Sequence, residues 1–183
     1  MINNMRHKKE NNIRKAKRRL LFKLKKFVPD IKIEILNVNS LYPGAIVSFT
    51  LSSKCERGYS EPIIYMPKDS LLNTKTVDFV ALHEIGHIIN IKKHFLLKKN
   101  EHNFEAKYSK FENEIYYQYD QIKEFDADDF AVKVQGLYKT VQMMREYFLI
   151  SLKKFSVPRK PLPPSVFKLK YRLLRLESFL KTN

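Results

Sequence analysis

The hydrophobic and polar positions in the first part of the chain predict a helix. From about 13 to 27 the apolar residues fall at helical spacing and leave a strongly basic opposite face. Pro29 ends this pattern, because proline cannot continue a helix. Residues 1–12 are mostly polar, and we expect them to be frayed. The sequence therefore predicts a basic amphipathic helix near the N-terminus.

Three short segments follow with the pattern of β-strands. Apolar and polar residues alternate over 31–35, which predicts a half-buried strand. Residues 45–51 are rich in β-branched and aromatic types and predict a second strand. The run 62–67 has a proline at each end, and because proline suits strand ends and edges we expect a short or edge strand there. Together these segments predict a small antiparallel-type sheet.

Helical spacing returns after these strands and continues to the end of the chain. Thr76 can cap a helix that runs to about Asn90. A long helix is predicted over about 110–135, where Gly136 ends it. Another helix covers roughly 137–155. Short strands followed by a series of helices are typical of an α+β protein.

The last predicted helix follows a proline-rich linker. The four prolines from 158 to 164 favour a stiff, extended segment. A helix over about 165–181 then carries an apolar stripe, which consists of Val166, Leu169, Leu173, Leu176 and Leu180. We expect a basic N-terminal helix (1–28), a central domain (29–155), and a linker with a basic C-terminal helix that packs on the domain (156–183).

The charge of the chain is concentrated at its two ends. The 183 residues contain 35 Lys and Arg against 19 Asp and Glu, a formal net charge of +16. Residues 6–26 hold 11 of the basic residues and residues 153–183 hold 9, each with a single acid. An anionic membrane surface or a nucleic acid would therefore be contacted through the basic ends. The alternative is that both ends are amphipathic helices whose Lys and Arg stems cover the core.

Composition excludes several classes of protein. Apolar residues make up 44% of the chain, which is too many for a disordered segment and enough for one domain. No apolar run approaches the roughly 18 residues of a membrane span, and no secretory signal is recognisable. Cys55 is the single cysteine, so no internal disulfide can form. We expect a cytoplasmic protein, or one peripheral to the membrane, and the oligomeric state is left open.

The strongest chemical signal is the run His-Glu-Ile-Gly-His at 83–87. Residues four apart lie on one face of a helix, so His83 and His87 can bind one metal ion. Zinc suits two imidazoles plus a carboxylate and leaves a fourth position for water. The metal would activate that water, and Glu84 would act as general base. By chance, such a run is expected only roughly once in a hundred chains of this composition.

A third protein ligand is offered by the predicted helix over 110–135. Glu124 and Asp128 are four apart on one face of it, which they share with Ala127 and Ala131. The small residues would let two helices approach closely. Glu124 would bind the metal, and Asp128 would accept a hydrogen bond from a ligand histidine and fix its tautomer. The alternative is an acidic, solvated helix face.

The runs at 83–87 and at 124–131 (Glu-Phe-Asp-Ala-Asp-Asp-Phe-Ala) resemble the motifs of the gluzincin metallopeptidases. Within that clan, H-E-x-x-H with a downstream E-x-x-A-D is similar to the HtpX-like and CAAX-prenyl-protease-like peptidases and to the ImmA/IrrE-like peptidases. The resemblance implies a zincin-like fold, in which a small sheet precedes an active-site helix and a second ligand-bearing helix. It also implies zinc on the two histidines and Glu124, with Glu84 as general base. Asp128 would contact a ligand residue rather than the zinc ion itself.

Weaker candidates lie outside these two motifs. Tyr116, Tyr117 and Tyr119 precede Glu124 by one to two helical turns, and one of them could donate a hydrogen bond to a tetrahedral oxyanion. The alternative for these tyrosines is packing at the edge of the core. Arg172 follows a Pro-Pro-Ser stretch, which is similar to the His-Pro-Pro stretch of HtpX-like chains. It could contact the oxyanion or the substrate, or it could be a solvated residue of an amphipathic helix.

The sequence therefore predicts a zinc metalloendopeptidase that acts on a protein or peptide substrate. A strand over 45–51 or 63–66 could hold an extended substrate by strand addition, if it lies at an edge of the sheet. The second hypothesis is a protein that binds a nucleic acid or a membrane surface and carries a regulatory or inactive metallopeptidase-like domain.

Overall fold

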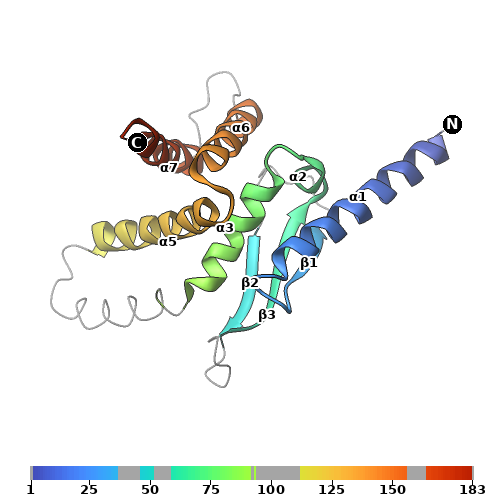
Figure 1. Cartoon of the computed structure of the whole chain (residues 1–183), viewed down its shortest axis with the longest axis horizontal. Helices are drawn as coiled ribbons and strands as arrows, with labels where there is room; N and C mark the ends of the chain where they lie inside the picture. The colour runs from blue at the N-terminus through green and yellow to red at the C-terminus, as the bar shows by residue number, and fades with distance from the viewer. Residues whose placement is uncertain are drawn as a thin grey trace.

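The computed structural model describes residues 2–36, 46–51, 59–91, 93, 112–155 and 164–182. Within these ranges the chain is an α+β protein, with a small sheet beside a larger group of helices (Figure 1). In chain order the elements are α1 (Ile2–Leu24), β1 (Lys32–Leu36), β2 (Ile46–Leu51), β3 (Tyr59–Pro67), α2 (Lys68–Leu72), α3 (Val77–Ile89), α5 (Glu112–Gln135), α6 (Leu137–Phe155) and α7 (Pro164–Lys181). Most of the proline-rich linker predicted before α7 lies outside the described residues.

The sheet is mixed, and its strand order is β1-β3-β2. Strand β2 pairs antiparallel with β3, whereas β1 pairs parallel with β3. The expectation of an antiparallel-type sheet is therefore wrong for one of the two pairings. Alternation along a strand specifies which of its faces is buried, but it does not specify which strand lies beside it or in which direction that strand runs.

Strand β3 is central, so the expectation of an edge strand at 62–67 is also wrong. Its prolines are tolerated because of where they fall. Pro67 is the last residue of the strand, and Pro62 lies where the pairing with β2 is irregular. Glu61, next to it, has a positive φ of 52°. Backbone N–H groups are not needed for pairing at such a bulge. Of the two strands considered for substrate binding, only β2 lies at an edge.

Helix α1 packs on the domain through its apolar stripe. Ile13, Leu20 and Leu24 are buried, whereas Arg14, Lys15, Arg18 and Arg19 are exposed. The helix begins at Ile2, so the expectation that residues 1–12 fray is wrong. No proline or glycine interrupts this segment, and most of its residues are fair or good helix formers. Its N-terminal part projects away from the rest of the protein (Figure 1), and residues 7–12 are all exposed.

Helix α3 is the centre of the fold. It contacts α1, β2 and β3 on one side and α5 and α6 on the other (Figure 1). Because it is enclosed in this way, its residues from Phe79 to Gly86 are all buried. Thr76 occupies the N-cap position as predicted, but its side chain makes no capping hydrogen bond. Burial of α3 thus removes most of the His-Glu-Ile-Gly-His run from bulk water, and His87 is the one residue of the run that is only partly buried.

The helices after α3 agree with the predicted ranges. Gly136 ends α5 with a φ of 88°, which a glycine adopts without strain. The apolar stripe of α7 is buried as far as Leu176 and packs against α6, while Leu180 is partly buried. The short helix α2 has no counterpart among the predicted elements. In the parts of the chain described here, none of the helices has the length and apolarity that crossing a bilayer requires.

Helices α3 and α5 cross at very close range. A Cβ atom added to Gly86 would lie 2.6 Å from the Cα atom of Ala127 and 2.9 Å from its carbonyl oxygen. Both contacts are with backbone atoms, so no side-chain rotation could relieve them. Gly86 is therefore required by helix packing, because any larger residue would separate the helices that carry His83 and Glu124.

We predict that Gly86→Ala lowers the free energy of unfolding by about 1–3 kcal/mol, the usual cost of overpacking a well-packed core. The control is Gly136→Asn. A Cβ at Gly136 would meet no atom within 4 Å, and Asn tolerates a positive φ, so we expect a change below about 1 kcal/mol. Chemical denaturation of the two variants measures the difference. Equal stability losses would contradict the close approach of α3 and α5.

Candidate metal centre

His83 and His87 lie one turn apart on α3, with their imidazole rings nearly perpendicular and the ring centroids 4.6 Å apart. Their Nε2 atoms are 3.1 Å apart. Glu124 of α5 faces both rings, with Oε2 at 3.3 Å from the Nε2 atom of His83 and Oε1 at 3.5 Å from that of His87. The structure thus brings together the three ligands that the sequence predicted, one carboxylate and two imidazoles from two different helices.

These distances fit a metal ion of the size of zinc. Zinc holds nitrogen and oxygen ligands at about 2.0–2.1 Å in a tetrahedron, which places neighbouring ligand atoms about 3.3 Å apart. The two imidazole nitrogens are 3.1 Å apart, and each has a different oxygen of Glu124 at 3.3 or 3.5 Å, so all three residues reach the space that one such ion would occupy. Within the part of the chain that the structure describes, these three residues also form a group whose ligand atoms all lie within 4.8 Å of one another. The donor set and its spacing therefore suit a metal ion.

Asp128 is hydrogen-bonded to Nδ1 of His83, the ring nitrogen that does not face His87. It lies one turn after Glu124 on α5, its side chain is 0% exposed, and its Oδ1 atom is 2.9 Å from the Nδ1 atom of His83. When Nδ1 carries the proton and donates it in this hydrogen bond, the lone pair of Nε2 is free to bind a metal. Asp128 thus occupies the position that the sequence predicted for it.

Arg172 of α7 lies in the middle of this cluster. Its Nε atom donates to Oδ2 of Asp128 at 2.8 Å, its Nη2 atom donates to Oδ1 at 2.5 Å, and its Nη1 atom donates to Oε2 of Glu124. Nη2 also lies 3.0 Å from Nδ1 of His83. The side chain is only 13% exposed, so the alternative of a solvated surface residue is wrong. A contact of Arg172 with substrate stays a prediction.

A sequence signal for the burial of Arg172 does exist. The residue lies three positions after Leu169 and four before Leu176, which are both buried. Arg172 therefore belongs to the apolar stripe of α7 itself. A charged residue on such a stripe predicts a buried partner of opposite charge, because an unpaired charge in a core is very costly. Asp128 and Glu124 are those partners.

The guanidinium of Arg172 and the imidazole of His83 keep the carboxylates of Asp128 and Glu124 in their charged form. Burial by itself raises the pKa of Asp128, but the charge and hydrogen bonds of Arg172 outweigh it, and the pKa is lowered. Burial likewise opposes ionisation of Glu124, but the hydrogen bond to His83 and the charge of Arg172 lower its pKa well below the usual range. The two carboxylates in turn raise the pKa of Arg172, although burial lowers it.

The pKa of His83 is shifted in the opposite direction from that of an ordinary buried histidine. Burial and the charge of Arg172 lower its pKa, but the hydrogen bonds to Asp128 and Glu124 and the charge of Asp128 outweigh them and raise the pKa to about 9. In the metal-free protein the imidazole is therefore protonated at neutral pH. A metal ion must displace that proton to bind at Nε2.

Tyr147 of α6 is a neighbour of the site that the sequence did not reveal. Its ring centroid is 6.2 Å from that of Phe79, and the charges of Arg172, Glu84 and Glu124 all act on its hydroxyl. Burial and the two carboxylates outweigh the guanidinium and raise its pKa to about 12, so the hydroxyl remains a hydrogen-bond donor at neutral pH. Nothing in the sequence distinguishes it from the core residues of α6.

The structure describes only some of the remaining residues that the sequence predicted for the site. Glu84 is buried on α3 next to His83. Tyr116, Tyr117 and Tyr119 belong to the first half of α5, but their side chains lie outside the described residues, and an oxyanion contact stays a prediction. The contact of the basic ends with a membrane surface or a nucleic acid also stays a prediction.

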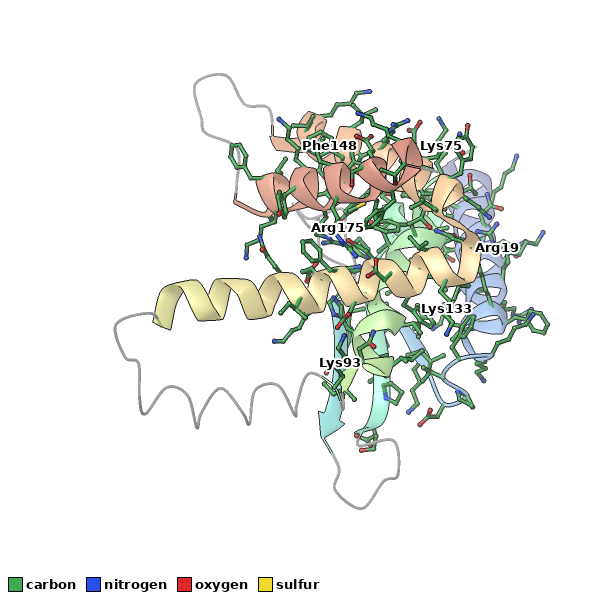
Figure 2. All side chains as sticks on the ribbon, turned by 60° about the vertical axis from the view of Figure 1, so that its left-hand side comes forward. Arg19, Lys75, Lys93, Lys133, Phe148 and Arg175 are labelled. Atoms are coloured by element: carbon green, nitrogen blue, oxygen red, sulfur yellow. The ribbon has the colours of Figure 1, made fainter. Side chains whose placement is uncertain are left out.

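Surface ion pairs hold α5 to its neighbours around this site. Arg175 of α7 lies between α7 and α5 (Figure 2), with Nη2 2.7 Å from Oδ1 and 2.6 Å from Oδ2 of Asp129. Lys93, beyond the end of α3, lies 2.7 Å from both carboxylate oxygens of Asp126. Both pairs are partly exposed and contribute little stability compared with the buried network.

No protein-family model, no curated protein and no solved structure matches this chain. A metal centre is therefore inferred from the arrangement of the residues themselves.

We predict that Asp128→Asn destabilises the protein by about 3–5 kcal/mol, because Arg172 would be left buried without its main counter-charge. The matched control is Asp129→Asn, the adjacent residue of α5, which also pairs with an arginine of α7. Its side chain is 49% exposed, so its pair is screened by water and the expected loss is below about 1 kcal/mol. Urea denaturation of both variants tests the prediction, and a similar loss in both would show that Asp128 is not a buried counter-charge.

Proposed function

We propose that this protein is a zinc-dependent metallopeptidase of gluzincin type, with a zincin-like fold in which α3 carries the active-site motif and α5 the third ligand. One observation carries the proposal. His83, His87 and Glu124 converge, with ligand atoms of the three residues all within 4.8 Å of one another and the two imidazole nitrogens 3.1 Å apart, a spacing that one zinc ion can bridge. The orientation of His83 by Asp128 supports it, because ligand histidines in metal sites usually donate their other N–H to such a group.

Zinc bound at these residues would supply a Lewis acid that makes water nucleophilic at neutral pH. In the proposed reaction, Glu84 accepts a proton from the attacking water and delivers a proton to the leaving amine. Arg172 keeps Asp128 and Glu124 ionised and fixed in place.

The competing account is an ion network that needs no metal. Arg172 already contacts both Glu124 and Asp128, and a protonated His83 completes the set of charges. In that account the cluster joins α3, α5 and α7 and has no chemistry. Metal binding and the role of Glu84 separate the two accounts, because a structural network needs neither.

We predict that the purified protein binds about one zinc ion per chain. Each of the variants His83→Ala, His87→Ala and Glu124→Ala should weaken zinc binding at least about 100-fold. The control is His7→Ala, because His7 is an exposed residue on α1 and should not affect it. Competition with a chromophoric chelator measures the affinity. Zinc binding that survives the loss of His87 would contradict the proposed ligand set.

Glu84→Gln should keep the zinc and reduce peptide cleavage by about 10²–10⁴-fold, the usual contribution of a general base. Cleavage is followed by mass spectrometry on a peptide mixture at equal zinc occupancy. Full activity of this variant would exclude Glu84 as the base.

We predict that zinc binding strengthens as the pH rises. The pKa of His83 is raised from 6.5 to about 9 in the metal-free protein, so zinc displaces a proton throughout the range below that value. The apparent zinc affinity should therefore rise about tenfold per pH unit between about 6.5 and 8.5.

The same protonation of His83 affects the stability of the metal-free protein. The stability that the charged imidazole contributes is complete below pH about 6.5 and is lost as the pH approaches about 9. Titrations at several pH values measure both effects, and a pH-independent affinity would contradict this.

A further inference from the structure

Several basic residues of α1 share one face of the helix, which is turned away from the domain. Residues three, four or seven apart lie on one face of a helix, and this spacing relates five exposed residues, which we call the outer face of α1: Lys8, Lys15, Arg18, Arg19 and Lys25. The backbone N–H of Lys25 still donates to the carbonyl of Leu21, at 2.9 Å, so the helical spacing extends to it. Arg19 lies at the outer edge of the molecule (Figure 2).

The charges of the outer face are not neutralised within the described part of the chain. None of its five side chains forms an ion pair or a side-chain hydrogen bond with another described residue. Lys23 differs from them, because its Nζ atom pairs with Asp78 of α3 at 2.9 Å. Glu10 is the single acid between residues 6 and 26, and its spacing places it on the side of positions 14 and 17. The outer face is therefore a row of like charges about 25 Å long, which attracts a polyanion.

A lipid bilayer does not suit this helix. An amphipathic helix binds a bilayer by inserting its apolar stripe, but Ile13, Leu20 and Leu24 of α1 are buried in the core of the domain. Among the described side chains of α1, Phe22 is the one large hydrophobic group that is exposed. Residues 7–12, in the part of the helix that projects from the domain, contain no apolar residue (Figure 1).

The projecting part of α1 suits the major groove of duplex DNA. Residues 7–12 are all exposed, so the described chain leaves each side of the helix accessible there. The major groove of B-DNA is about 12 Å wide and admits an α-helix, whereas the major groove of duplex RNA is too narrow for side chains to read. Lys8 and Lys9 can contact phosphates, and Asn11 and Asn12 are of a type that forms hydrogen bonds with base edges.

We propose that α1 binds duplex DNA, with its projecting end in the major groove and its outer face on the phosphates. Phosphate contacts dominate such an interaction, so the affinity depends little on base sequence and strongly on salt. The described residues of α1 contribute no ligand to the candidate metal centre. DNA binding therefore does not rest on the proposed peptidase function.

The test measures binding of the full chain to a fluorescent duplex of about 20 base pairs, two turns of the double helix. Fluorescence anisotropy at several salt concentrations gives the affinity. If the five residues of the outer face each contact one phosphate, the logarithm of the affinity should fall with the logarithm of the salt concentration with a slope of about −4.5. Absence of binding, or a slope near zero, would overturn the proposal.

A triple variant removes three charges from the outer face: Lys8→Gln, Lys15→Gln and Arg18→Gln. The slope should become smaller in magnitude by about 3, and binding at about 0.1 M salt should weaken at least about 100-fold. The matched control makes the same change in net charge at exposed positions of α6 and α7, through Lys139→Gln, Lys170→Gln and Lys181→Gln. The control should keep the wild-type slope. Equal effects of the two triple variants would show that only the net charge of the protein matters, and would overturn the proposal.

The kind of partner is tested with two further probes. Duplex RNA of the same sequence and vesicles of anionic lipid should bind more weakly than duplex DNA at equal salt, and tighter binding of either would overturn the assignment to DNA. Methylation of guanine N7, an atom of the major groove, should be reduced by the wild-type protein and not by the outer-face variant. Unchanged methylation would contradict insertion of α1 in the major groove. Thermal unfolding shows whether the variants keep their fold.

Discussion

The buried carboxylate of Asp128 is the group on which the arrangement of the site depends. It is fully buried on α5, and it is held by His83 of α3 and by two nitrogen atoms of Arg172 of α7. An ionised carboxylate in this position would be strongly destabilising without these partners. The three helices must therefore come together at this point, and the positions of His83 and Glu124 follow from that. The contact of Gly86 with Ala127 lets α3 and α5 approach closely enough.

The same network sets the electrostatics of the proposed metal centre. Arg172 neutralises one carboxylate charge, so Asp128 and Glu124 together leave one negative charge next to the two imidazoles. In the metal-free protein the proton on His83 balances that charge, because its pKa is raised to about 9. In the proposed metal-bound state, a divalent cation would take the place of this proton. The buried network would thus act as a preformed site, because it positions the proposed ligands through interactions that do not require a metal.

Much of the site could be predicted from the sequence, because it depends on local spacing. Residues four apart share a helix face, and this spacing alone pairs His83 with His87 and Glu124 with Asp128. The neighbours of β3 could not be predicted in the same way, since strand pairing depends on contacts between distant segments. Tyr147 could not be found either, because it looks like a core residue of α6. Arg172 could be predicted only in part. Its place on the apolar stripe of α7 is visible in the sequence, but its partners Asp128 and Glu124 are not.

The most direct test of a zinc site between α3 and α5 is anomalous diffraction at the zinc absorption edge from crystals of the zinc-loaded protein. The account predicts one strong anomalous peak, with Nε2 of His83, Nε2 of His87 and an oxygen of Glu124 each about 2.0–2.2 Å from the ion. It also predicts that Asp128 stays hydrogen-bonded to Nδ1 of His83. An anomalous peak at another place in the protein would contradict a zinc site between α3 and α5. The absence of any peak, with Glu124 bound only to Arg172, would contradict it as well.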